Sequence, residues 1–173
     1  MDPSEYLAFI PLLIYGLAIA DLLSEWKRFL NKKHIYLPYI IMTIIFIEVS
    51  IYNVFIYINL VNKMQGASYL SYLKFISPPF LFLIMVKSFT PDKDDPTKEY
   101  FDKNKLIFFS LFASFIASHY LFNFNENEFS ILGRIISICL VVTAGLLKKN
   151  WAIYILLISW FLTLLTRLDI IST

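Results

Sequence analysis

The sequence predicts an all-α integral membrane protein, a bundle of six transmembrane helices joined by short loops. Of its 173 residues, 58% are hydrophobic and only 16% are charged, whereas a soluble domain carries about 25% charged residues. The charged residues gather between long apolar runs, as they do in the loops between membrane spans. Alternation of apolar and polar residues is absent, so helices are expected to satisfy the backbone in lipid.

Six apolar segments meet the length of about 20 residues that a helix needs to cross a bilayer. The first contains Ala18-Ile19-Ala20, as at the cleavage site of a signal peptide, but Asp2 and Glu5 stand where such a peptide carries basic residues, so we expect it to be retained. The longest connection has sixteen residues, from Thr90 to Lys105, so no soluble domain is expected. Residues 1–173 therefore form one domain, with spans expected at 5–23, 37–60, 69–89, 105–122, 130–147 and 151–170.

The positive charges predict the orientation of these spans. The first, third and fifth connections hold eleven Lys and Arg residues, whereas the second and fourth hold one, Lys63. Because the loops on the cytoplasmic side carry the excess of basic residues, the odd-numbered connections are expected in the cytoplasm. Both termini then lie on the non-cytoplasmic side of a multi-pass protein of the cell membrane.

A carboxylate in the second span is the principal candidate for function. Glu48 lies about 18 Å from either end of its span, at a rise of 1.5 Å per residue. At that depth it must be protonated, paired or exposed to a wet cavity, and such residues mark ion or proton pathways. Tyr52 and Asn59 continue a polar stripe on the same face. The alternative is a protonated Glu48 that bonds a neighbouring helix and serves only packing.

Four potentially basic side chains are expected at one level near the outer ends of their spans. If they turn inward, they form a basic vestibule that favours anions. If they face the boundary between lipid and water, they are interfacial anchors, and the histidine has the further interpretation of a hydrogen-bonded packing residue. The sequence leaves these interpretations open for Lys74, His119, Arg134 and Arg167.

Two prolines interrupt the third span near its centre. Pro78 and Pro79 lack the backbone donors that would reach the carbonyls of Lys74 and Phe75, so we expect a kink there. Carbonyls freed in this way can form a cation site. These lie shallower than Glu48, so we favour a kink beside a cavity.

Small residues recur at helical spacing in the fourth span. Such a face allows close approach between helices in lipid, and its serines are expected to add interhelical hydrogen bonds. Shorter versions pair Gly16 with Ala20 and Gly133 with Ser137, and these faces suit packing within one subunit or between subunits. The stripe in the fourth span consists of Ser110, Ala113, Ser114, Ala117 and Ser118.

Enzyme signatures are absent from the sequence, which has no H-E-x-x-H, no G-x-S-x-G and only four glycines. The predicted topology puts His34 and His119 on opposite sides of the membrane, and Cys139 is the single cysteine. We therefore expect no metal, no cofactor and no catalytic activity. The net charge of +2 is too small to indicate a nucleic-acid partner.

Two classes of function remain. The first is a transport protein, an oligomeric ion channel or an ion- or proton-coupled carrier, with Glu48 on its pathway and the basic level as its mouth. The second is a membrane-embedded accessory or scaffold subunit that docks a cytoplasmic protein through its basic loops. The lipid bilayer and further copies of the chain are the expected partners in the first class.

Overall fold

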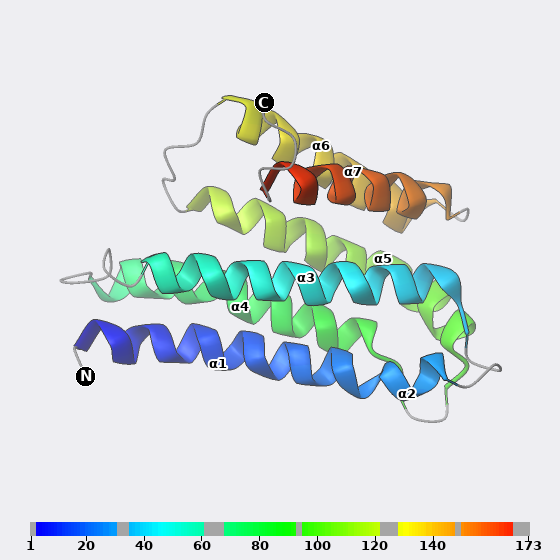
Figure 1. The fold of residues 1–173 in the computed structure, drawn as a ribbon, viewed down its shortest axis with the longest axis horizontal. Coiled ribbons are helices and arrows are strands. Elements are labelled where there is room, and N and C mark those ends of the chain that lie inside the picture. Colours follow the sequence, from blue (N-terminus) through cyan, green and yellow to red (C-terminus); the bar gives the residue numbers. More distant parts are fainter. Residues whose placement is uncertain are drawn as a thin grey trace.

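A computed structural model describes residues 3–30, 35–60, 68–92, 95–121, 128–147 and 150–167, all as helices and connections without a strand (Figure 1). Within the helices, the side chains of residues 3–8, 27, 59–60, 121, 128–130 and 166–167 are not described. The six long helices are α1 (Pro3–Ser24), α3 (Leu37–Leu60), α4 (Tyr69–Phe89), α5 (Thr97–Ser118), α6 (Glu128–Leu146) and α7 (Trp151–Arg167). Two single turns complete the described elements, α2 (Trp26–Phe29) and the 3-10 turn η3 (His119–Leu121).

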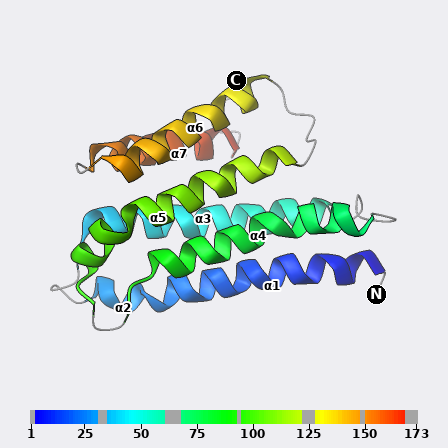
Figure 2. The same ribbon diagram turned by 180° about the vertical axis from the view of Figure 1, so that it is seen from behind.

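The long helices pack side by side in a closed order. Each contacts the next in the sequence α1, α4, α5, α6, α7, α3 and back to α1, and α3 also contacts α5. Successive long helices run in opposite directions, with α1 at one edge and the pair α6–α7 at the other (Figures 1 and 2). The first, third and fifth connections therefore lie at one end of the bundle, which we call the inner end.

The predicted spans agree closely with α3 and α4, and the largest difference is at α5. The helix begins at Thr97, eight residues before the predicted start, so the long connection shrinks to Thr90–Pro96. Its first turns are polar, but Thr97, Phe101 and Lys105 are buried against the rest of the bundle. The prediction was wrong because it equated the helix with its apolar run, whereas this helix projects beyond it.

Within the part of the chain that the structure describes, two helical stretches are long and apolar enough to cross a membrane, Leu37–Ile58 and Tyr69–Phe89. The apolar stretches Phe9–Ser24, Ile131–Leu146 and Trp151–Leu165 are shorter. In α5, charged residues occupy the first turns. Two such helices give weak support for a membrane protein, and the six predicted spans stay a prediction.

Aromatic rings fill the space between α1, α3, α4 and α5. The Phe46 ring of α3 lies 5.0 Å from both Phe89 of α4 and Phe112 of α5, measured between ring centroids. Tyr39 stacks on Phe89 at 4.5 Å, and Tyr15 of α1 meets Phe82 at 5.6 Å. Edge-to-face and stacked pairs at these distances each stabilise a core beyond the area that they bury. This half of the bundle is a packed aromatic core.

Gly145 is where α6 approaches α5 most tightly among the described glycines. A Cβ atom at this position would lie 3.0 Å from the Cβ of Phe109, whereas one at Gly133 would meet nothing within 4 Å. We expect Gly145→Leu to lower the free energy of unfolding by about 1–3 kcal/mol relative to Gly133→Leu, because only the first overpacks the contact. Denaturant unfolding of both variants in detergent measures the difference between their free energies of unfolding. Equal stabilities would contradict the close contact between Gly145 and Phe109.

Candidate functional site

Glu48 joins the middle of α3 to α7. Its Oε2 accepts a hydrogen bond of 2.7 Å from the indole Nε1–H of Trp160, a residue 112 positions away in the sequence. Both side chains are half-buried. The indole is a donor only, so it can serve Glu48 as a carboxylate or as a neutral acid.

A second contact joins α3 to the end of α5. The His119 Nε2 atom lies 3.0 Å from Oδ1 of Asn53, and Nδ1 lies 2.9 Å from the carbonyl oxygen of Phe115. The Asn53 amide is oriented by its own Nδ2–H, which donates to the carbonyl of Val49 at 2.7 Å. The histidine is therefore a hydrogen-bonded residue between two helices, and Asn53 is a partner that the sequence analysis missed.

Arg134 brings α6 to the same end of the bundle. Its guanidinium lies 5.6 Å from the centroid of the Tyr120 ring, within the range of a cation–π contact. The Tyr120 hydroxyl in turn donates to the carbonyl of Ile131 at 3.2 Å. We call the set that links α3 and η3 to α6 and α7 the polar seam; it consists of Glu48, Asn53, His119, Tyr120, Arg134 and Trp160.

The other predicted pathway residues are placed less closely together. Lys74 is exposed on α4, which packs mainly against α1 and α5. Tyr52 is half-buried on α3. The side chains of Asn59 and Arg167 lie outside the part of the chain that the structure describes. Of the four basic side chains predicted at one level, the structure brings two together, because Arg134 contacts Tyr120, the residue next to His119.

The carbonyls expected to be freed by the proline pair are both bonded to hydroxyl groups. α4 runs as one helix through Pro78 and Pro79, which are buried, so the helix is not broken, and the kink stays a prediction. The Ser77 hydroxyl donates to the Lys74 carbonyl at 2.8 Å. The Tyr57 hydroxyl of α3 donates to the Phe75 carbonyl, also at 2.8 Å. Each of these two carbonyls therefore has a hydrogen-bond donor in place of the backbone N–H that proline lacks.

Tyr57→Phe is expected to destabilise the protein by about 1–3 kcal/mol, because it removes the hydroxyl that donates to the buried Phe75 carbonyl and that also interacts with the Tyr15 hydroxyl. Tyr57 is 3% exposed, so water does not replace the lost hydroxyl. Tyr69→Phe is the matched control, since Tyr69 is 77% exposed. Thermal unfolding in detergent compares the two, and an equal effect of both substitutions would show that the bond to Phe75 is unimportant.

The stripe of small residues on α5 is only partly used within the chain. Ala113 and Ser118 are buried, whereas Ser110, Ser114 and Ala117 are exposed. The predicted interhelical bonds are wrong for two serines, because Ser114 donates to Ser110 at 2.9 Å and Ser118 to Phe115 at 2.6 Å, both carbonyls of α5. Serine in a helix reaches its own preceding turn readily, and the spacing alone does not reveal this.

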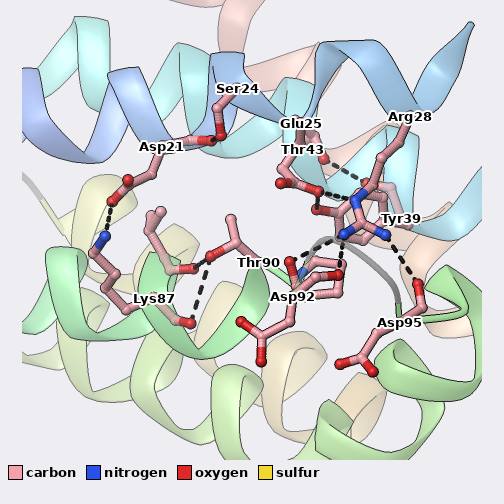
Figure 3. A network of polar contacts seen from close by, with 12 residues as sticks. Asp21, Ser24, Glu25, Arg28, Tyr39, Thr43, Lys87, Thr90, Asp92 and Asp95 are labelled. Carbon is pink, nitrogen blue, oxygen red and sulfur yellow. Dashed lines mark hydrogen bonds and ion pairs between the residues drawn. The ribbon is translucent and has the colours of Figure 1, made fainter.

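At the inner end, Arg28 connects the first connection to the third (Figure 3). Its Nε atom pairs with Glu25 at 2.6 Å, and its two terminal nitrogens donate to the carbonyls of Asp95 at 2.9 Å, Pro91 at 3.2 Å and Asp92. Tyr39 donates to the same carboxylate of Glu25 at 3.2 Å. This Arg28 network holds the carbonyls of Pro91, Asp92 and Asp95 against α2.

A second inner network connects α5 to the fifth connection and to Tyr36, which precedes α3. The Lys105 ammonium donates to the carbonyl of Leu147 at 2.9 Å and to Oδ1 of Asn150 at 2.8 Å. Asn150 donates to the Tyr36 hydroxyl at 2.6 Å, and that hydroxyl donates to Asp102 at 3.2 Å. Burial raises the pKa of the Tyr36 phenol, so the hydroxyl keeps the proton that it donates.

Comparison with known proteins adds no relative. No family model matches the chain, and no significant match is found among curated proteins or solved structures.

Proposed function

We propose that this chain is a small multi-spanning membrane transport protein that works as an oligomeric ion channel or as an ion- or proton-coupled carrier. The observation that carries the proposal is Glu48, an ionisable side chain in the middle of a long apolar helix. It is half-buried and bonded to Trp160 at 2.7 Å. Ionisable groups placed in this way are costly in lipid and mark pathways for ions or protons.

The exposed apolar surface supports the membrane part of this proposal. In α3 and α4, only 44% and 33% of the apolar window is buried, whereas a core helix of a soluble protein is mostly buried. Exposed apolar surface of this extent marks contact with lipid or another protein. The exposed side chains include Ile44, Ile51, Phe55 and Ile58 on α3, Leu70, Leu73, Phe80 and Ile84 on α4, and Ile155, Ile158, Phe161 and Leu162 on α7.

The position of the polar seam supports a pathway on one side of the bundle. Aromatic rings pack the space between α1, α3, α4 and α5, which leaves little polar surface there. Glu48 bonds Trp160 of α7, and Tyr120, next to His119, contacts Arg134 of α6, so these residues lie where the two halves of the bundle meet. A wet path beside α6 and α7 avoids the aromatic core and passes polar groups.

The exposed small residues support an oligomer. Gly16 on α1 and Ser110, Ser114 and Ala117 on α5 are exposed, and a Cβ at Gly16 would meet nothing within 4 Å. In lipid, faces of this kind let a second helix approach closely. A further copy of the chain is the partner that the proposal assigns to them.

At the inner end, two basic side chains are poorly placed for the accessory role, whereas Lys98 and Lys103 are exposed. Docking of a cytoplasmic partner through basic loops requires basic side chains that are free to pair with it. Arg28 and Lys105 are 9% and 5% exposed and are bonded to carbonyls of this chain. These two are therefore used for folding and are poorly available to a partner.

Ion flux through the purified protein in liposomes tests the proposal. Glu48→Gln keeps an oxygen that accepts the Trp160 hydrogen bond but removes the charge, so it separates a pathway role from packing. We expect gradients of protons, sodium, potassium or chloride to drive flux in the wild type. Glu48→Gln should change its rate, selectivity or pH dependence, because the carboxylate no longer ionises.

Trp160→Phe is the complementary variant, since it removes the donor and leaves the carboxylate. A pathway role predicts flux that persists with altered pH dependence. If Glu48→Gln is indistinguishable from wild type and Trp160→Phe only unfolds more easily, Glu48 serves packing. An inserted wild-type protein without flux under any of these gradients would overturn the transport function.

A further inference from the structure

We propose that His119 is a proton-binding site that controls the contact between α3 and the end of α5. A neutral imidazole has one N–H donor and one acceptor nitrogen. Both ring nitrogens of His119 lie within hydrogen-bond distance of an oxygen, the Phe115 carbonyl at 2.9 Å and Asn53 Oδ1 at 3.0 Å. Both contacts are hydrogen bonds only when the ring carries two protons.

The orientation of Asn53 decides that its oxygen faces the ring. Its Nδ2 lies 2.7 Å from the carbonyl oxygen of Val49, which can only accept. Turning the amide over would place two acceptor oxygens at that distance. The Phe115 carbonyl is likewise an acceptor only. The two backbone carbonyls thus fix Asn53 Oδ1 as an acceptor and require His119 to donate twice.

The surroundings oppose the charge that this geometry requires. From α6, the Arg134 guanidinium repels a positive ring, and the half-buried position removes water from it. α5 presents the uncharged Phe115 ring at 4.8 Å between centroids. On α3, the titratable residues nearest Asn53 in the sequence are Tyr52, Tyr57 and Glu48. Tyr57 donates to the Phe75 carbonyl, and Glu48 is bonded to Trp160. Two hydrogen bonds therefore favour the doubly protonated His119 ring, whereas Arg134 and burial oppose its positive charge. Because these effects oppose each other, a change of pH can remove one of the two ring protons.

Loss of the proton changes the link between helices. If Nδ1 keeps its hydrogen, Nε2 and Asn53 Oδ1 become two facing acceptors, and the contact with α3 opens. If Nε2 keeps its hydrogen, the ring loses its bond to Phe115 at the end of α5. The identification of the proton as the coupling ion rests on the proposed transport function, whereas the site itself rests on this geometry.

The chain has two histidines, so His34→Gln leaves His119 as the single imidazole. We would label histidine and asparagine with nitrogen-15, place the variant in lipid nanodiscs and follow the ring nitrogens by NMR. The titration runs from about pH 2 to pH 9, which covers ordinary imidazole values and extends well below them, because burial and Arg134 oppose the charged ring. We expect both nitrogens to be protonated at the acid end, one to lose its proton as pH rises, and the Asn53 amide signal to move in step.

Two substitutions provide the matched comparison. Asn53→Ala removes the oxygen that accepts from His119 Nε2. The doubly protonated ring should then lose its second proton at a lower pH than in the parent protein. Asn104→Ala removes an amide that bonds Tyr100 of its own helix at 3.2 Å and should leave the titration unchanged. A single neutral form of His119 throughout, or a ring that titrates while Asn53 does not respond, would overturn the proposal. Titration without liposome flux would refute transport alone, and flux without titration would refute this site alone.

Discussion

Arg28→Met is expected to lower the free energy of unfolding by about 3–5 kcal/mol, the usual loss when one partner of a buried ion pair is removed. The Arg28 and Glu25 side chains are 10% and 12% exposed. The substitution leaves the Glu25 carboxylate without its cation and removes the donors from the carbonyls of Pro91, Asp92 and Asp95. Denaturant unfolding in detergent measures the loss, and limited proteolysis should cut the 90–96 connection faster.

The control for Arg28 is another basic residue of the inner end. Lys87 pairs with Asp21 at 2.8 Å, but its side chain is 62% exposed (Figure 3). Such pairs contribute about 0–1 kcal/mol, so Lys87→Met should leave the stability nearly unchanged. If Lys87→Met were as harmful as Arg28→Met, loss of positive charge would explain both results and the Arg28 network would not.

Lys105→Met is expected to cost about 1–3 kcal/mol, because each buried acceptor left without a donor carries a penalty of that order. Met preserves the apolar stem, so the loss reports the ammonium contacts with Leu147 and Asn150. The effect should appear as separation of the α6–α7 pair from α5, seen as faster amide hydrogen exchange near residue 147. The exposed neighbour Lys103 is the control, and an equal loss in Lys103→Met would contradict the role of Lys105.

Sequence reasoning located the helices well where an apolar run coincides with a helix. The bounds of α3 and α4 match the predicted spans because connections rich in polar residues flank both apolar runs. It failed at α5, where Thr97, Phe101 and Lys105 are buried within polar turns. Hydropathy cannot distinguish a polar turn that packs against a neighbour from one that is a loop.

The partners of the candidate residues were beyond prediction because they are distant in sequence. Glu48 was identified from its depth, but its donor lies 112 residues away. Arg28 was counted only among the basic residues of the odd-numbered connections, although it bonds carbonyls more than 60 residues further along the chain. The chemistry of proline predicted that Pro78 and Pro79 leave the carbonyls of Lys74 and Phe75 without backbone donors. It did not predict that the Tyr57 hydroxyl bonds the Phe75 carbonyl.

The most direct test of the account is which side of a membrane each end of the bundle faces. Replacing Cys139 with serine removes the single cysteine, so new cysteines can be placed one at a time. Suitable positions are Ser68, which precedes α4, and Lys98, in the first turn of α5; both are exposed, and they lie at opposite ends of the bundle. With an impermeant thiol reagent on intact cells, we predict labelling of Ser68→Cys. Lys98→Cys should react only after permeabilisation. Equal labelling of both in intact cells, or a chain that is soluble without detergent, would contradict the membrane-spanning bundle.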